Sequence, residues 1–335
     1  MGLRRSQLLQ MAGGFGLSLG LPKVAPAVSQ GFADPLPSWR PGSLKQAIVN
    51  FVQRACTLGS PHYIPPVDRI ATFDNDGTLW CEQPLVQAMF ILDYLKTQIA
   101  DHPDLAAKPM VAELFTLNQM DLSHQQTATD SLLRVALWVT GNMAQAQFLE
   151  AVNRFFATAV HPHYGLAYSR LVYQPQLELL SYLQAHGFQT WLCSAGDIDL
   201  MRQISWPIYG IPAQQVIGSA LEKEYRQVDG GFEIWRRPVV DLINDQRGKP
   251  VGIERAIGKP PVLACGNVGS GGDIAMLTYS QSSPYDSLQL LVNHDDQDRE
   301  FVYGEADNAS LLAAQQQGWQ VISMQKEWLI IFPQG

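Results

Sequence analysis

The sequence predicts an α/β protein: a doubly wound, mostly parallel sheet with helices on both faces, and an all-helical domain inserted after the first recognisable strand. Two patterns indicate this fold. From residue 171 onward, short apolar runs alternate with helical segments. Between residues 85 and 160, apolar residues recur at helical spacing and no strand-like alternation interrupts them. The 335 residues, 46% hydrophobic and 16% charged, suffice for a core and an inserted module.

The elements follow in order along the chain. Residues 28–84 hold an amphipathic segment, "LKQAIVNFVQRA", and then the apolar strand "IATF". Pro84 suits the first position of a helix, so residues 85–170 are expected to form the helical insertion, including "SLLRVALWV" and "AQAQFLEAVNRFFATAV". Residues 171–335 return to the core with a helix closed by Gly187. Short apolar runs predict the remaining strands: "FQTWLCS", "QVIGS", "PVLAC", "LQLLVN" and "WQVISM".

Charge and cysteine content narrow the function classes. The net charge is −8 and no Lys/Arg run follows residue 5, which argues against nucleic-acid binding because that needs a basic face. The 4 cysteines show no C-x-x-C spacing. Cys193 and Cys265 lie in apolar strand-like runs, so we expect buried free thiols rather than a disulfide framework.

Residues 1–27 have the layout of a secretory signal. Arg4 and Arg5 precede a Gly-rich apolar stretch at 11–21, and Ala25-Pro26-Ala27 closes the segment. The arginine pair resembles a twin-arginine signal, which predicts export to a bacterial periplasm. The stretch is too short and too Gly-rich for a stable membrane span. A disordered or amphipathic N-terminal tail is the alternative.

Polar residues follow several predicted strands where the strands end. Ligands of open α/β sheets bind beyond the carboxyl ends of the strands, so these residues are the site candidates. They are Asp74, Asp76 and Thr78 after "IATF", Ser194 and Ala195 after "TWLC", Asn267 and Asp273 after "VLAC", and Lys249 just upstream of that last strand.

These segments resemble, in order and spacing, the four motifs of the haloacid dehalogenase superfamily. "FDNDGTLW" is similar to the first motif, "WLCSAG" to the second, Lys249 to the third and "GGDIAML" to the fourth. The resemblance covers essentially everything after residue 27 and is strongest to the phosphoserine-phosphatase-like branch. It implies a Rossmann-like core with a helical cap between the first two motifs, and a Mg²⁺-dependent phosphatase acting on a small phosphomonoester.

The residues suit that chemistry. A phosphomonoester repels nucleophiles, so hydrolysis needs a positioned attacker and positive charge around the phosphoryl oxygens. Asp74 is the expected nucleophile and Asp76 the expected general acid and base. Mg²⁺ is expected between Asp74, Asp76 and Asp273. The phosphoryl oxygens are expected to be bound by Lys249 and by the segments around Thr78, Ser194 and Ala195. Arg247 and Lys259 are alternative candidates for the cation that Lys249 is expected to supply.

The fourth motif departs from the usual form. "GNVGSGGD" has Asn267 at its first position, so one carboxylate is missing from the expected metal shell, although the Asn267 carbonyl can still serve as a ligand. A non-catalytic phosphate-binding relative therefore stays open as an alternative. A dehalogenase is a further alternative, but Asp76 argues against it because a halide leaving group needs no general acid. Substrate identity and oligomeric state remain open.

Three weaker features complete the expectations. Trp80 and Glu82 follow the first motif where core and cap should meet, so each is expected either to touch substrate or to serve as hinge or packing. His161 and His163 flank a proline, and we expect a structural role rather than a metal pair. The charged run at 294–300 is expected to be a solvated loop.

Overall fold

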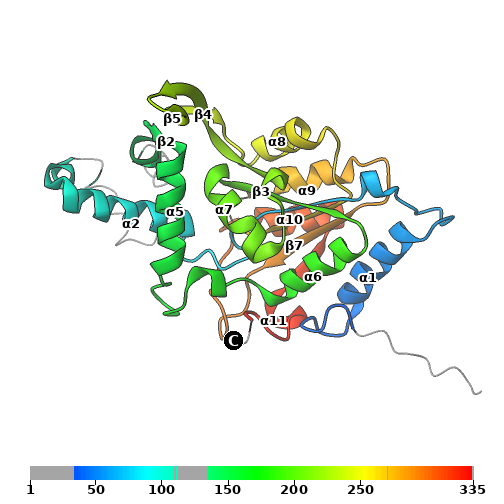
Figure 1. Ribbon diagram of the computed structural model, residues 1–335. Coiled ribbons are helices and arrows are strands. Elements are labelled where there is room, and N and C mark those ends of the chain that lie inside the picture. Colours follow the sequence, from blue (N-terminus) through cyan, green and yellow to red (C-terminus); the bar gives the residue numbers. More distant parts are fainter. Residues whose placement is uncertain (1–33, 109–110, 112–134, 270, 334–335) are drawn as a thin grey trace, which may run out of the picture. The chain divides into compact units, whose positions relative to one another are not determined.

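A mixed sheet of 8 strands, in the order β2-β5-β4-β3-β1-β6-β7-β8, organises the protein. Figure 1 shows the computed structural model, which describes residues 34–108, 111, 135–269 and 271–333. From β4 to β8 along this order, neighbouring strands are parallel. The strands are β1 (Ile70–Phe73), β2 (Met143–Ala144), β3 (Gln189–Asp197), β4 (Val216–Val228), β5 (Gly231–Leu242), β6 (Leu263–Asn267), β7 (Leu288–Asn293) and β8 (Gln320–Ser323).

The sheet winds outward in both directions from β1, as predicted for a doubly wound fold. Strands β3 and β4 lie on one side of β1, and β6, β7 and β8 lie on the other. All four residues of β1 are buried because helices cover both faces of the sheet. The two neighbours of β1 come from different halves of the chain, so the carboxyl end of β1 is the switch point where such sheets bind ligands.

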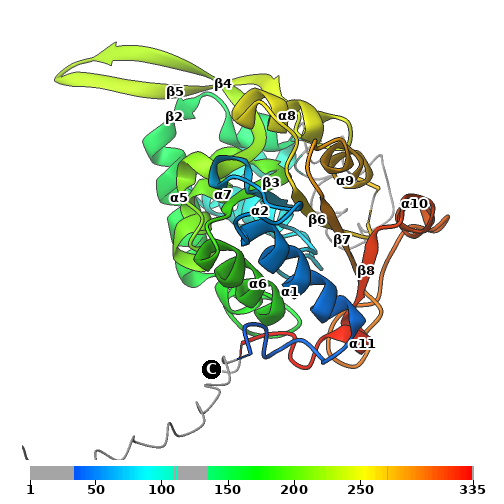
Figure 2. The ribbon, with the colours of Figure 1, turned by 90° about the vertical axis from the view of Figure 1, so that its right-hand side faces the viewer.

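Two separate apolar clusters fill the space between helices and sheet. In β6, Cys265 belongs to one cluster and Ala264 to the other, as the two-residue period of a strand requires. The first cluster includes α1 (Ser43–Cys56), α6 (Gln174–Ala185) and α7 (Ile198–Tyr209); the second includes α8 (Gly248–Ile257), α9 (Ile274–Gln281) and α10 (Ala309–Gln317) (Figure 2). The last described helix is α11 (Met324–Glu327), and short 3₁₀ turns occupy Pro66–Asp68 and Ala213–Gln215.

The inserted segment follows β1 and is mainly helical where it is described. It contains α2 (Val86–Asp101), 3₁₀ turns at Pro103–Ala107 and Tyr168–Arg170, a helical stretch at 135–140, and α5 (Gln145–Thr158). Phe90 of α2 contacts Phe148 and Phe155 of α5, with ring centroids 5.8 and 5.6 Å apart. Burial of such aromatic side chains stabilises by about 1.5–3 kcal/mol each, which holds the two helices together. The first half of the predicted helix "SLLRVALWV" lies outside the described residues.

The expectation of an all-helical insertion is wrong at one point. Met143 and Ala144 form the short strand β2, which pairs in antiparallel fashion with Arg236 and Trp235 of β5. The physical reason is the long hairpin formed by β4 and β5, which offers unpaired backbone groups at its edge. Figure 2 shows this hairpin extending away from the rest of the sheet. The sequence signal for this hairpin is "DGG" between two runs of strand-forming residues, which our sequence analysis did not include.

The thiol and membrane expectations can be compared with the described part of the chain. All 4 cysteines are free, and Cys193 and Cys265 are fully buried, which confirms the prediction for these two. Within the described residues, every helix is too short or too polar to cross a bilayer. Residues 35–335 cluster as one unit, whereas 1–34, which contain the expected signal, lie outside the described residues except for Asp34.

Candidate active site at the carboxyl end of β1

The ends of β1 and β6 bring the first and fourth motifs side by side. The Asp74 main-chain N–H donates to Cys265 O at 2.9 Å, continuing the ladder in which Phe73 is the register partner of Cys265. Asp273 then precedes α9, and its Oδ2 accepts the Asn267 main-chain N–H at 3.0 Å. The carboxylates of Asp74 and Asp273 therefore converge although they are 199 positions apart, as the numbering shows.

A single buried ammonium lies between these two carboxylates. Lys249 Nζ, from the first turn of α8, donates to Asp74 Oδ1 at 2.7 Å and to Asp273 Oδ1 at 2.5 Å. Its competitor Lys259 bonds instead to Asp68, at 2.8 Å. Burial would lower the pKa of Lys249, but the charges of Asp273 and Asp74 outweigh burial and raise it, so the side chain stays charged. Burial, and next the charge of Asp273, raise the pKa of Asp74.

A tight turn after β1 positions Asp76. Gly77 has φ +70°, and Gly77 N–H donates to Trp80 O at 2.9 Å, so the chain reverses at once. Trp80 Nε1–H donates to Asp76 Oδ1 at 2.8 Å and holds that carboxylate in place. Burial raises the pKa of Asp76, with the Trp80 hydrogen bond acting in the opposite direction.

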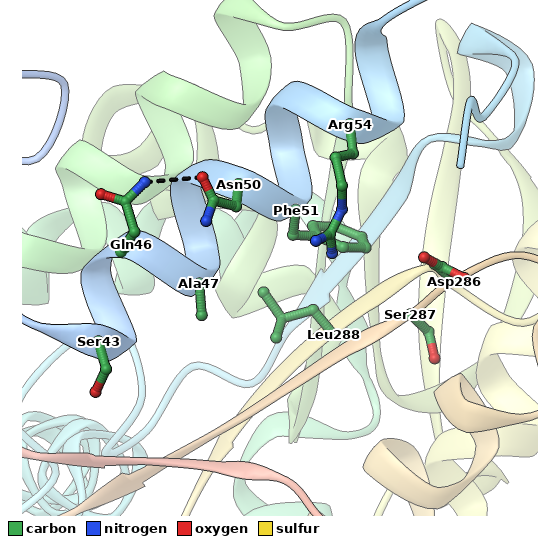
Figure 3. A pocket seen from close by; sticks show the side chains of 9 residues that line it. All are labelled: Ser43, Gln46, Ala47, Asn50, Phe51, Arg54, Asp286, Ser287 and Leu288. Carbon is green, nitrogen blue, oxygen red and sulfur yellow. Dashed lines mark hydrogen bonds between the residues drawn. The ribbon is translucent and has the colours of Figure 1, made fainter. Parts of the chain in front are cut away.

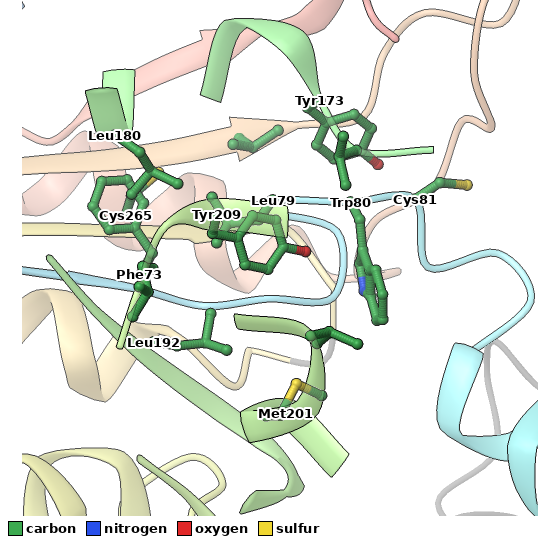
Figure 4. Packing of buried hydrophobic residues seen from close by; sticks show 14 of the residues in the cluster. Phe73, Leu79, Trp80, Cys81, Tyr173, Leu180, Leu192, Met201, Tyr209 and Cys265 are labelled. Carbon is green, nitrogen blue, oxygen red and sulfur yellow. The ribbon is translucent and has the colours of Figure 1, made fainter. Parts of the chain in front are cut away.

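Trp80 also joins the core to the insertion. It is 1% exposed, and its ring lies 6.0 Å from that of Phe156 in α5. Figure 4 shows it among the buried residues of the first cluster, which also contains Leu79 and Tyr209. The structure thus gives Trp80 both a packing role and a contact with a predicted catalytic group.

The second motif lies on the other neighbour of β1. Ser194 is fully buried in β3, its Oγ accepts the Gly196 N–H at 3.0 Å, and its carbonyl accepts Asn244 Nδ2–H at 2.8 Å. Ala195 is exposed, and its carbonyl accepts the Ser219 hydroxyl at 2.7 Å. On the β1 side, Thr78 is fully buried, and its hydroxyl has no hydrogen-bond partner among the described residues.

Sequence reasoning missed Gln87, which reaches the second motif from the first turn of α2. Its Oε1 accepts the Asp197 N–H at 2.9 Å. A Cβ at Gly196 would lie 1.5 Å from Gln87 Nε2, so the glycine makes room for this amide. The position of Gln87 at the start of the predicted cap helix was the available signal.

The charged run at 294–300 is not a solvated loop, which corrects the sequence expectation. His294 and Glu300 are 1% and 4% exposed. His294 Nε2 lies 2.8 Å from Gly77 O and 2.8 Å from the Tyr303 hydroxyl, and its Nδ1 lies 3.2 Å from Glu300 Oε2. Tyr173 OH donates to Glu300 Oε1 at 3.2 Å. Mutual hydrogen bonds make this burial tolerable, and no local pattern reveals such distant partners.

His161 has the structural contacts expected of it. Its Nε2 lies 2.7 Å from Gln83 O, just before α2, and its Nδ1 accepts the His163 N–H at 3.1 Å. The ring therefore connects the start of the insertion with its return to the core.

The donor set fits a hard divalent cation. Lys249 holds the carboxylates of Asp74 and Asp273 together, and Asp76 follows Asp74 by two positions. Burial raises the pKa of Asp74 and of Asp76. Carboxylate and carbonyl oxygens are the ligands that Mg²⁺ prefers, with water and phosphate completing the shell. Among the described residues, no three His, Cys, Asp or Glu side chains form a group that could hold a metal ion, so main-chain carbonyl, amide, water and phosphate oxygens would have to supply the other ligands.

A cavity of about 570 Å³ lies elsewhere, between α1 and the residues that lead into β7 (Figure 3). Its lining includes Gln46, Arg54 and Asp286. Leu288 begins β7, so the cavity lies at the amino end of that strand, away from the edge where the motif residues meet. It has no part in the site described above.

Comparisons with known proteins identify the family of this chain. The family model of haloacid dehalogenase-like hydrolases matches residues 71–277, more than half of the chain. A conserved protein of unknown function from Anaerococcus prevotii has a TM-score of 0.53 at 14% identity, over 84% of this chain and 91% of its own. This likeness shows the fold alone.

Two further solved structures are similar at lower TM-scores. A protein of unknown function from Bordetella pertussis gives 0.48 at 19% identity, over 76% of this chain and 98% of its own. A phosphoserine phosphohydrolase-like protein from Francisella tularensis has a TM-score of 0.40 at 16% identity, over 73% of this chain and 99% of its own. A search of curated proteins finds no match. With its α/β core and the family model spanning all four motifs, the chain belongs to the haloacid dehalogenase-like hydrolases.

Proposed function

We propose that this protein is a Mg²⁺-dependent phosphomonoesterase of the phosphoserine-phosphatase-like branch, acting through an aspartyl-phosphate on Asp74. One observation carries the proposal: Lys249 is bonded to both Asp74 and Asp273 at the carboxyl end of β1, with Asp76 two positions away. A carboxylate nucleophile beside a fixed ammonium is what attack on a phosphate ester requires, because the ammonium offsets the charge of the ester.

The chain's own groups account for both half-reactions. An Asp74 carboxylate oxygen attacks phosphorus, the ester P–O bond breaks, and the leaving oxygen takes a proton from Asp76. Asp76, now ionised, removes a proton from water, and the water oxygen attacks the same phosphorus. The bond between Asp74 and phosphorus then breaks and releases inorganic phosphate. Burial raises the pKa of Asp76 and so favours the protonated form that the first step needs.

Mg²⁺ would be held by the Asp74 carboxylate, the Asp76 main-chain carbonyl, Asp273 and the Asn267 amide oxygen. When bound, it would neutralise charge on the phosphoryl oxygens. Ser194, Ala195 and Thr78 would orient the phosphoryl group through hydroxyl and main-chain donors, and Lys249 would hold the nucleophile.

The other parts of the chain complete the proposal. Residues 85–170 would act as a cap over a core made of 28–84 and 171–335, with Trp80 and Glu82 where they meet. The Arg4-Arg5 signal would direct export to a bacterial periplasm, which fractionation of expressing cells would test. A small-molecule phosphomonoester is the proposed substrate class. Asp76 disfavours a dehalogenase, and the altered fourth motif keeps a non-catalytic relative as the second candidate.

The test is phosphate release from a panel of phosphomonoesters, with Mg²⁺ and again with a chelator. We expect metal-dependent release that Asp74→Asn lowers by at least about 10³-fold without unfolding the protein. Asp229→Asn, an exposed aspartate in the turn between β4 and β5, is the control and should keep full activity. Retained activity in Asp74→Asn would exclude Asp74 as the nucleophile. No release by a folded, Mg²⁺-binding sample would favour the non-catalytic candidate.

A further inference from the structure

Glu82 lies directly beside the asparagine that replaces an acidic residue in the fourth motif. Asn267 Nδ2 donates to Glu82 Oε1 at 3.3 Å and to the Asp76 main-chain O at 3.2 Å. Glu82 comes from the segment after β1 and Asn267 from the end of β6, 185 positions apart. The carboxylate missing from position 267 is thus matched by one that arrives from another part of the chain.

These two contacts determine which way the Asn267 amide faces. Both partners of Nδ2 are oxygen atoms, a carbonyl and a carboxylate, so the NH₂ group must point toward them. The amide oxygen then points away from Glu82. Without Glu82, the Asn267 NH₂ group would lose one of the two hydrogen-bond acceptors that fix its direction.

Glu82 is itself held in place by the buried cluster behind the turn. A Cβ at Gly77 would lie 1.8 Å from Asn267 Nδ2, 2.7 Å from the Tyr303 hydroxyl and 2.8 Å from Glu82 Oε1, so all three groups converge on the bare glycine. The Tyr303 hydroxyl bonds to Glu82, and its next neighbour is His294 at 2.8 Å. These contacts give the Glu82 side chain a defined position before any ligand binds.

We propose that Glu82 is a positioning residue for the cation site. It places a carboxylate beside the Asn267 amide and fixes the direction of that amide through its bond to Nδ2. The inference rests on the Mg²⁺ site of the proposed function, but not on phosphate release.

The test is Mg²⁺ binding to the full chain by isothermal titration calorimetry, without substrate. Glu82→Gln keeps the size of the side chain and removes the charge. Since outer residues that orient a ligand typically contribute 10–100-fold in metal affinity, we expect a rise in Kd of about 10-fold or more. Glu178→Gln, at a partly buried glutamate that bonds Ser38 in a different region, is the matched control and should leave Kd unchanged.

A double variant separates this role from a general loss of structure. Glu82→Gln with Asn267→Asp moves the carboxylate to position 267 and leaves an amide at 82 that can donate to it. We expect its Kd to return to within about 3-fold of wild type, an order of magnitude tighter than Glu82→Gln alone. Circular dichroism of each metal-free variant verifies folding.

The outcomes distinguish this inference from the proposed function. If wild type binds Mg²⁺ and Glu82→Gln binds it equally tightly, the role of Glu82 is refuted and the proposed function stands. A double variant that binds no tighter than Glu82→Gln also refutes it. If wild type binds no Mg²⁺, both fail. If wild type releases no phosphate but the binding series behaves as expected, only the catalytic proposal fails.

Discussion

Arg236 is a buried cation outside the site with three hydrogen-bond partners, and replacing it with methionine should destabilise the protein strongly. Its side chain is 0% exposed, and its Nη2 donates to Asp197 Oδ2 at 2.6 Å. Nη1 bonds Asp199, Nε donates to Thr140 O at 2.9 Å, and the guanidinium carbon lies 3.7 Å from the Phe148 ring centroid. One side chain of β5 therefore connects the hairpin, the insertion and the start of α7.

The magnitude follows from what Arg236→Met leaves behind. Removing one partner of a buried ion pair costs about 3–5 kcal/mol, because the remaining charge is uncompensated. Here Asp199 keeps Lys223 as a partner, and the Asp197 side chain is 25% exposed. Both facts place the expected loss of unfolding free energy near the lower end of that range, about 3 kcal/mol. For about 300 residues with an unfolding entropy of about 2.1 cal/mol/K each, the melting temperature should fall by about 5 °C.

The neighbouring residue in the same strand is a matched control. Arg237 Nη1 also pairs with a carboxylate, Glu222 Oε2 at 2.7 Å, but the two side chains are 48% and 40% exposed. Exposed pairs contribute about 0–1 kcal/mol, so Arg237→Met should lower the melting temperature by less than about 2 °C.

Thermal unfolding followed by circular dichroism, with urea unfolding as a second measure, compares the two variants. Equal shifts for Arg236→Met and Arg237→Met would refute the reasoning, because burial would then not decide the cost. A shift below about 1 °C for Arg236→Met would refute it as well.

Two more predictions concern His161 and Trp80. Burial lowers the pKa of His161 below its ordinary value near 6.5, so on acidification the unfolded chain binds a proton at this residue before the folded chain does. The free energy of unfolding should therefore fall as the pH drops below about 6.5, by at most about 1.4 kcal/mol per pH unit. His161→Ala should remove that part of the slope in urea unfolding between pH 7.5 and 5.5; an unchanged slope contradicts it. Trp80→Phe removes the hydrogen bond to Asp76, so kcat should fall about 10-fold more for alkyl phosphates than for p-nitrophenyl phosphate, whose leaving group needs little protonation. Equal losses for both esters would exclude a role of Trp80 through Asp76.

The convergence of the site residues could be anticipated from the sequence because it depends on local signals and one rule of topology. Strands β1 and β6 are short and apolar, Asp74 directly follows β1, and Asn267 is the last residue of β6. Ser194 lies inside β3, near its carboxyl end. Parallel strands end at the same edge, so residues after different strands must meet there. Local sequence could not distinguish Lys249 from Lys259 as the lysine of the site, because the distinction depends on which lysine the fold places near Asp74. That lysine is Lys249, in the first turn of α8.

What the sequence determined by itself was therefore the parallel strands from β4 to β8, and the chemical types gathered at the edge of the sheet. Tertiary structure alone decided that His294 is buried, that Arg236 connects the hairpin to the insertion, and that Glu82 lies beside Asn267. The physical reason is the range of the signals. Periodicity and turn residues act over a few positions, whereas burying a charge is tolerable only when a partner arrives from far along the chain, and that partner is defined only once the chain has folded.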